Sequence, residues 1–142
     1  MPKPTLTIGY YPLRGKAQVC RLLCEYLGIS YEDKQFSLHE WDTYKKEKLS
    51  KSSIKDLPYL EEGDFMVTGS IPMCLYVVDR FAGGDLLGRD LKDQAIVDMY
   101  LWTVDSMSGI INLNCQKKSV EEIQEFKEAQ WNGVVAPKLQ KY

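Results

Sequence analysis

The chain has 142 residues, of which 44% are hydrophobic, 27% charged and 11% aromatic, close to an average soluble protein. This composition excludes a disordered tail, a fibrous repeat and a low-complexity segment, and the length allows one ordinary domain or two small ones. No apolar run approaches the roughly 20 residues that cross a bilayer, so we expect no membrane span. The N-terminus lacks the apolar core and cleavage site of a secretory signal, which predicts a cytoplasmic protein.

The charge balance argues against a nucleic-acid partner. The net charge is −2, from 18 basic and 20 acidic residues, so the chain offers no basic face for phosphates. A local basic run at Lys45, Lys46, Lys48 and Lys51 is interrupted by acidic residues, and we interpret it as a solvated helix face.

The cysteines predict neither a metal site nor a disulfide framework. Cys20, Cys24, Cys74 and Cys115 form no Cys-x-x-Cys pair, and His39 is the sole histidine of the sequence. A tetrahedral zinc site needs four closely placed ligands, which this pattern does not supply. We expect no metal, and free, buried or half-buried thiols in a reducing compartment.

The first 36 residues predict a parallel crossover unit. A strand is expected over 5–10, a helix after Gly15 and Lys16, a helix stop at Gly28, and a second strand over 30–36. Strand, helix and strand within about 30 residues is typical of two parallel strands joined by a helix. The predicted apolar stripe of the helix consists of Val19, Leu22, Leu23, Tyr26 and Leu27.

The next segment predicts a hairpin and another helix. The polar stretch 37–55 suggests a loop with a short exposed helix. Two apolar runs, 57–60 and 65–67, flank a glycine turn and predict a β-hairpin. Ser70 is then expected to cap a helix that has Pro72 in its first turn. The stripe expected on this helix is Cys74, Val77, Val78 and Phe81.

Beyond a glycine-rich linker the pattern is helical. We expect a first domain over 1–82, a linker over 83–89 and a helical domain over 90–142. Ser119 and Glu122 form a capping box at the start of a second helix in that domain, which Pro137 would bend. The stripe on the first of these helices is Ile96, Met99, Tyr100, Thr103, Met107, Ile110 and Ile111.

Three segments carry a more specific signal: Ile8–Ala17 with Arg21–Leu23, Leu57–Leu60 with Gly63 and Thr68–Ser70, and Ile96–Met99 inside a predicted helix over 94–105. The first resembles the opening of a cytosolic glutathione transferase, most like the tyrosine-dependent mu, pi and sigma classes. The second resembles the glutathione-binding hairpin of that family, and the third the first helix of its second domain. The resemblance implies an α/β, thioredoxin-like N-terminal domain of order β-α-β-α-β-β-α, followed by an all-α domain that is here incomplete.

The resemblance implies that Tyr10 activates the thiol of bound glutathione. A free thiol is only about 3% thiolate at pH 7, and lowering its pKa by roughly two units takes about 2.7 kcal/mol. A hydrogen bond to a charged group supplies about 1.5–3 kcal/mol, so one phenol donor can provide most of this stabilisation. The alternative is that Tyr10, which shares its alternation with Leu6 and Ile8, is simply a core residue.

Four further positions correspond to glutathione contacts by resemblance. Tyr11 would line the boundary between glutathione and the electrophile, and a cis bond before Pro58 would turn the backbone of Leu57 toward the cysteinyl part of glutathione. Ser70 would receive the γ-glutamyl carboxylate at a helix N-terminus. The plain alternatives are an ordinary trans proline and a serine that only caps its helix.

The other implied contacts are more distant in sequence. Trp41 and Lys45 resemble the pair that holds the glycyl carboxylate, although a free solvated lysine is the ordinary alternative. Arg14 would support the site, and Asp98 would reach the γ-glutamyl amine from a partner subunit or be a plain helix carboxylate. Gly69 stands where relatives carry a glutamine, and losing that contact would cost about 1 kcal/mol.

The expected function is therefore a glutathione transferase, which conjugates reduced glutathione as co-substrate to electrophilic small molecules without a metal or other cofactor. Such an enzyme would act as a homodimer or in a larger assembly. The alternative is a non-catalytic structural or interaction subunit on the same scaffold, suggested by Gly69 and by a chain shorter than its relatives. A glutaredoxin-like role is less favoured, because no cysteine follows the first predicted strand.

Overall fold

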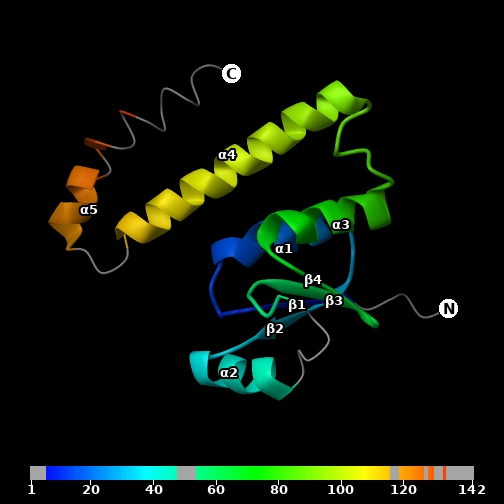
Figure 1. The fold of residues 1–142 in the computed structure, drawn as a ribbon, viewed down its shortest axis with the longest axis horizontal. Helices are drawn as coiled ribbons and strands as arrows, with labels where there is room; N and C mark the ends of the chain where they lie inside the picture. Colours follow the sequence, from blue (N-terminus) through cyan, green and yellow to red (C-terminus); the bar gives the residue numbers. More distant parts are fainter. Residues whose placement is uncertain (1–5, 48–53, 116–118, 127, 130–132, 134–142) are drawn as a thin grey trace. The chain divides into compact units, whose positions relative to one another are not determined.

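The computed structural model describes residues 6–47, 54–115, 119–126, 128–129 and 133 (Figure 1). The chain divides into two compact units, Met1–Asp93 and Gln94–Tyr142, each of which is described by itself. The break between them falls just beyond the linker expected over 83–89.

The first unit contains a four-stranded mixed sheet in the order β2-β1-β3-β4. Strand β1 runs parallel to β2 and antiparallel to β3, which pairs with β4 in a hairpin. This arrangement confirms the thioredoxin-like order expected for the first domain and the helical pattern beyond it. The elements are β1 (Leu6–Tyr10), η1 (Gly15–Ala17), α1 (Gln18–Tyr26), β2 (Tyr31–Gln35), α2 (Leu38–Glu47), β3 (Tyr59–Glu62), β4 (Phe65–Thr68), α3 (Ser70–Ala82), α4 (Leu91–Cys115) and α5 (Val120–Phe126).

Helices α1 and α3 lie together on one face of the sheet, and α2 lies on the other (Figure 1). The core beneath α1 and α3 is formed by alternate residues of the strands, such as Leu6, Ile8 and Leu60, packed against Met73 and Val77 of α3. All five side chains are fully buried, and each contributes about 1.5–3 kcal/mol through removal of apolar surface from water. This core fixes the positions of the strand ends.

An aromatic cluster occupies the opposite face, where α2 covers the sheet. Its buried members are Phe36, Trp41 and Tyr59, with Tyr44 packed against them. The rings of Tyr44 and Tyr59 are nearly parallel, with centroids 6.0 Å apart. Gly9 lies beneath Tyr59, because a Cβ at this position would fall 2.1 Å from the Tyr59 Cε1 atom. Glycine on β1 therefore makes room for the aromatic cluster.

The stripe predicted for the first helix was wrong. Val19, Leu22 and Tyr26 are 54%, 59% and 75% exposed, although Leu23 and Leu27 pack against the core. The buried residues of α1 are instead Cys20, Arg21 and Cys24, preceded by the buried Ala17 at the end of η1. Small cysteine side chains allow α1 to approach α3 closely, which the larger aliphatic residues would prevent.

The prediction that Ser70 caps α3 was also wrong. Gly69 is the N-cap residue, with a φ of +95° and no side-chain capping bond, and Ser70 is the first residue of the helix. A φ in this range is strained for residues with a Cβ, which explains glycine at this position. The expected position of Pro72, in the first turn of α3, is confirmed.

Two other helices begin with a complete capping box. At α5, the Ser119 N–H donates to Glu122 Oε2 at 2.7 Å, and the Glu122 N–H donates to Ser119 Oγ at 3.2 Å, as predicted. At α2, Ser37 and Glu40 make the same reciprocal pair. The polar stretch 37–55 was predicted only as a loop with a short exposed helix, without this capping box.

The second unit contains α4 from Gln94 onward, and α5. On α4, the predicted stripe begins with Ile96, Met99 and Tyr100, which are exposed within the described part of the chain. The side chains of Ile110 and Ile111, and the bend expected at Pro137, lie outside the described residues. No helix among those described is both long and apolar enough to cross a membrane.

The described cysteines are free thiols, as predicted. Cys20, Cys24 and Cys74 are all buried in the core between the sheet, α1 and α3. The side chain of Cys115 lies outside the described residues. Within the segments that the structure describes, no group of three or more metal-ligating side chains is close enough to hold an ion.

Candidate functional site

Tyr10 is the last residue of β1. Its ring packs in the core, and its hydroxyl lies against the backbone of η1. The residue is 9% exposed, and the ring belongs to the core cluster, as the core alternative expected. The hydroxyl oxygen accepts a hydrogen bond from the Lys16 N–H at 3.4 Å. An N–H can only donate, so the phenolic proton is not used in this bond and can be donated to a ligand.

Gly15 allows this close approach of the Tyr10 ring to the backbone. It has a φ of +39°, and a Cβ there would lie 2.8 Å from Tyr10 Cε1 and 2.9 Å from the Tyr10 oxygen. The ring therefore rests directly on the turn that starts η1.

Ser70 reaches the same turn from the start of α3. Its hydroxyl donates a hydrogen bond to the Lys16 carbonyl oxygen at 2.9 Å. The first N–H groups of a helix have no partner within the helix, and they form the positive end of the helix dipole. The N-terminus of α3 therefore lies in the same corner as Tyr10 and can attract an anion.

The third side of the corner is the bond between Leu57 and Pro58, which is cis, as the resemblance predicted. The Gly69 N–H donates to the Pro58 carbonyl at 2.9 Å, so this loop lies against the start of α3. The N–H of Leu57 donates to the Asp56 carboxylate at 2.8 Å. A peptide ligand that used this N–H would first have to displace the Asp56 side chain. We call the group of Tyr10, Lys16, Leu57, Pro58 and Ser70 the Tyr10 corner.

The aromatic cluster adjoins the Tyr10 corner through Tyr11 and Leu57, which contact both hydrophobic clusters of the first unit. The ring centroids of Tyr10 and Tyr11 are 5.5 Å apart. Trp41 is buried in the aromatic cluster, and Lys45 Nζ lies 5.9 Å from its ring centroid. Lys45 also pairs with the Asp42 carboxylate at 3.5 Å. Trp41 and Lys45 are therefore neighbours, as their spacing on one helical turn indicates.

Three candidate residues remain: Arg14, Gly69 and Asp98. Arg14 is exposed, and its carbonyl accepts the Gln18 N–H at 3.0 Å. Gly69 adjoins Pro58 but has no side chain to offer a ligand. Asp98 is exposed on α4 and belongs to the second unit. The binding roles given to these residues by the resemblance stay predictions.

Arg21 supports the loop that follows Tyr10, a role that the sequence analysis missed. The residue is only 8% exposed. Its Nε donates to Asp33 Oδ1 at 2.8 Å, and its Nη1 donates to the Leu13 carbonyl at 2.9 Å. Arg21 therefore ties the 11–14 loop to α1 and β2. The sequence offered one indication of this role, which is that Arg21 is a charged residue next to Cys20 in a mostly apolar segment.

The buried thiols form a separate hydrogen-bonded group. Hydrogen bonds to Cys24 and Cys74, with burial, raise the pKa of the Cys20 thiol. The same bonds from Cys20 lower the pKa of Cys24 and of Cys74. Because these side chains are packed in the core, none of them presents a nucleophile at the surface.

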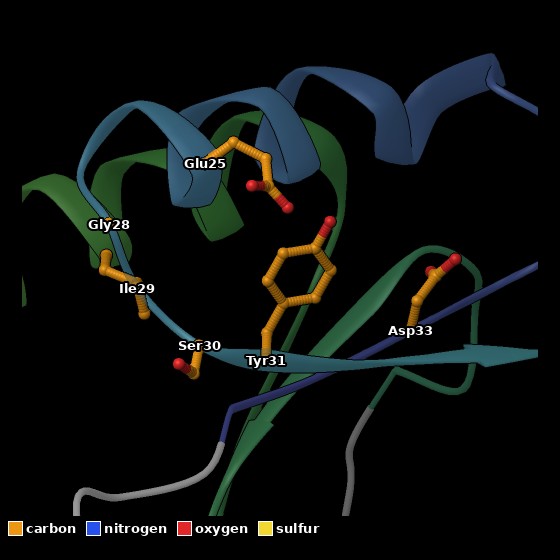
Figure 2. A pocket seen from close by; sticks show the side chains of 6 residues that line it. All are labelled: Glu25, Gly28, Ile29, Ser30, Tyr31 and Asp33. Carbon is orange, nitrogen blue, oxygen red and sulfur yellow. The ribbon is translucent and has the colours of Figure 1, made fainter.

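An open cavity of about 530 Å³ lies at the start of β2, which is an edge strand of the sheet (Figure 2). Its lining residues are Glu25, Gly28, Ile29, Ser30, Tyr31 and Asp33. Figure 2 shows the Tyr31 ring extending from β2 toward Glu25 on α1. Burial and the nearby Glu25 carboxylate raise the pKa of the Tyr31 hydroxyl. Because Tyr31 pairs with Leu6, at the opposite end of β1 from Tyr10, this cavity is distinct from the Tyr10 corner.

Comparison with known proteins gives the same family that the sequence motifs resemble. The family model described as "Glutathione S-transferase, N-terminal domain" matches residues 6–79. A class-mu 26 kDa glutathione S-transferase of Schistosoma mansoni is 32% identical over 93 residues, covering 65% of this chain and 46% of the relative. The hematopoietic prostaglandin D synthase of Gallus gallus is 28% identical over 141 residues, covering 97% of this chain and 64% of the relative.

A solved structure supports the fold. A monomeric glutathione S-transferase of the hookworm Necator americanus superimposes with a TM-score of 0.72 at 22% identity, covering 96% of this chain and 63% of the other. Because the family model spans more than half of the sequence, the protein belongs to the glutathione S-transferase family through its N-terminal domain. The chain spans about half the length of the mu-class relatives that it matches.

Proposed function

We propose that the chain binds reduced glutathione in the Tyr10 corner and that the Tyr10 hydroxyl stabilises the glutathione thiolate for attack on an electrophilic small molecule. The observation that carries this proposal is the hydrogen bond from the Lys16 N–H to the Tyr10 oxygen. It leaves the phenolic proton available at the carboxyl end of β1, beside Pro58 and the start of α3. Membership of the glutathione S-transferase family supports the choice of ligand.

The corner offers complementary groups for the other parts of the tripeptide. The N-terminus of α3 attracts the γ-glutamyl carboxylate, and the backbone of Leu57 pairs with the cysteinyl unit once Asp56 has moved aside. Lys45, beside Trp41, is available to the glycyl carboxylate. Its exposed ion pair with Asp42 costs little to exchange, because such pairs contribute about 0–1 kcal/mol.

The chemical step transfers the glutathione sulfur to carbon. The thiol proton is lost to solvent, the Tyr10 O–H donates to the resulting thiolate, and the sulfur lone pair forms the new C–S bond. With an aryl halide, the C–halogen bond then breaks and the halide leaves with its electron pair. Tyr10 lowers the energy of the thiolate and is not consumed.

The cellular setting and the assembly are part of the same proposal. Free thiols at Cys20, Cys24 and Cys74 fit a reducing compartment such as the cytoplasm. A homodimer would allow Asp98 of a partner subunit to meet the γ-glutamyl amine. Small electrophiles are the expected second substrate, as in detoxification.

The test is Tyr10→Phe, which removes the hydroxyl and keeps the ring. Losing a hydrogen bond to a charged group costs about 1.5–3 kcal/mol, so kcat/KM for glutathione with an aryl halide should fall about 10- to 150-fold. Tyr26→Phe is the matched control, since Tyr26 is an exposed tyrosine on α1 and its loss should leave the rate unchanged. Equal activity of Tyr10→Phe and wild type would refute the proposal.

A second candidate is a non-catalytic subunit on the same scaffold. Two observations favour it: Gly69 has no side chain for the ligand, and the Leu57 N–H is already bonded to Asp56. Calorimetric titration with glutathione separates the two functions. Binding in the micromolar to millimolar range supports the enzyme, whereas no heat together with stable association in a larger complex supports the scaffold role.

A further inference from the structure

The backbone of Lys16 joins the two hydroxyl groups of the Tyr10 corner. Its N–H donates to the Tyr10 oxygen at 3.4 Å, and its carbonyl accepts from the Ser70 hydroxyl at 2.9 Å. Tyr10 ends β1 and Ser70 begins α3, so they come from elements far apart in the sequence. One residue of η1 therefore holds both side chains.

The bond between Ser70 and Lys16 determines what the Ser70 hydroxyl can still donate or accept. A carbonyl oxygen only accepts, so Ser70 gives its single hydroxyl proton to Lys16. While this bond stands, the Ser70 oxygen can accept a hydrogen bond but cannot donate one to a carboxylate. An anion at the start of α3 would then be held by backbone N–H groups, while the Ser70 hydroxyl stays bonded to the Lys16 carbonyl.

Any displacement of Lys16 is transmitted to Tyr10, because the two are in direct contact. The Lys16 N–H is bonded to the Tyr10 oxygen, and the adjacent Gly15 leaves less than the space of a methyl group beside the ring. The ring itself is packed in the core, so a shift of η1 reaches it at the hydroxyl, where the Lys16 N–H is bonded. A small shift of η1 therefore changes the distance and angle at which the phenol meets a ligand sulfur.

We propose that Ser70 is a positioning residue for Tyr10. Its bond to the Lys16 carbonyl holds η1 against the tyrosine and so sets the position of the phenolic donor. This inference rests on the proposed function, and it adds a coupling between the N-terminus of α3 and the thiol. Ser70 then affects thiolate formation even for a thiol that carries no γ-glutamyl group.

The test compares Ser70→Ala and Ser70→Thr with the control Ser30→Ala, in the full chain. Ser30 is an exposed serine in the loop before β2, away from the Tyr10 corner. The pH dependence of kcat/KM is measured with glutathione and with cysteinylglycine, which lacks the γ-glutamyl carboxylate. Partial loss of the phenol–thiolate bond in Ser70→Ala should lower kcat/KM about three-fold at pH 6.5 with both thiols and by less at pH 8.5.

Ser70→Thr keeps the hydroxyl and should restore the wild-type profile, and Ser30→Ala should not alter it. If Ser70→Ala raises KM for glutathione but leaves both pH profiles unchanged, Ser70 acts on the ligand alone and the inference is overturned. A profile that changes with glutathione but not with cysteinylglycine overturns it in the same way.

A second measurement does not depend on turnover. Hydrogen exchange of the Lys16 amide in the ligand-free chain should be several-fold faster in Ser70→Ala than in wild type or Ser30→Ala, because η1 is less firmly held. Unchanged exchange would overturn the inference while leaving the proposed function intact. Faster exchange in a chain that has no transferase activity would support the coupling and refute the proposed function.

Discussion

Replacing Gly9 with alanine should destabilise the first unit strongly, because the new methyl group would enter the Tyr59 ring. The Cβ would lie 2.1 Å, 2.3 Å and 2.7 Å from three ring carbons of Tyr59. Ordinary carbon contacts are about 3.5–4.0 Å, so the ring would have to retreat by more than about 1 Å. Tyr59 is fully buried among Phe36, Trp41 and Tyr44, which leaves it no free space.

The expected cost lies at the upper end of the range for overpacked cores, about 3 kcal/mol. In urea denaturation followed by far-UV circular dichroism, this loss shifts the midpoint down by about 1.5 M if m is about 2 kcal/mol/M. The strain should disappear when the ring is removed, so Gly9→Ala should cost about 1 kcal/mol or less in a Tyr59→Leu background.

The double-mutant comparison makes the reasoning falsifiable. Equal destabilisation by Gly9→Ala in the wild-type chain and in the Tyr59→Leu variant would show that the methyl group does not meet the ring. A near-neutral Gly9→Ala in the wild-type chain would contradict the packing of the aromatic cluster itself.

Three further predictions concern the supports of the Tyr10 corner and a helix start. Asp33→Ala should lower the free energy of unfolding by about 2 kcal/mol, because it leaves the buried guanidinium of Arg21 without its anion; a loss below about 0.5 kcal/mol in urea denaturation would argue against this role. Gly69→Ala should cost about 1 kcal/mol because of its positive φ, and thermal unfolding that matches wild type would contradict this. Bonds from the Ser37 hydroxyl and N–H lower the pKa of Glu40, so the contribution of this carboxylate to the α2 cap should be complete above the ordinary carboxyl value of 4.5 and be lost as the pH falls from there through the lowered pKa. In NMR titration, Ser37→Ala removes the hydroxyl and keeps the N–H, so the pKa of Glu40 should move part of the way back toward that ordinary value. An unchanged pKa would show that the Ser37 hydroxyl is not a cause.

The strand order and the hairpin could be predicted because local signals agreed with the final fold. Gly28, Gly63 and the apolar runs around them mark turns and strand ends at which the structure does turn. The cis bond before Pro58 followed from the family resemblance and not from the local sequence, since most proline bonds are trans.

The buried face of α1 could not be predicted from apolar spacing. Val19, Leu22 and Tyr26 form a regular stripe, yet the buried residues of α1 are Cys20, Arg21 and Cys24. The choice between the two faces depends on how closely α3 approaches and on the partner that Asp33 offers the arginine. Both depend on the tertiary structure, and no local sequence pattern indicates them.

The candidate site shows the same division. Tyr10 could be proposed from its motif, whereas the link from Lys16 to Ser70 depends on backbone groups, which no residue pattern identifies. The prediction that Ser70 caps α3 failed because its hydroxyl is used across the fold instead of on its own helix. Gly69 takes the cap position that the serine was expected to fill.

The role proposed for the Tyr10 hydroxyl is to stabilise the thiolate of bound glutathione. The most direct test is a pH titration of thiolate absorbance for glutathione bound to wild type and to Tyr10→Phe, by ultraviolet difference spectroscopy. Bound glutathione should ionise well below the free thiol value of about 8.5 on wild type, and close to that value on Tyr10→Phe. Identical titration curves for the two proteins, or no thiolate on wild type below pH 8, would contradict it.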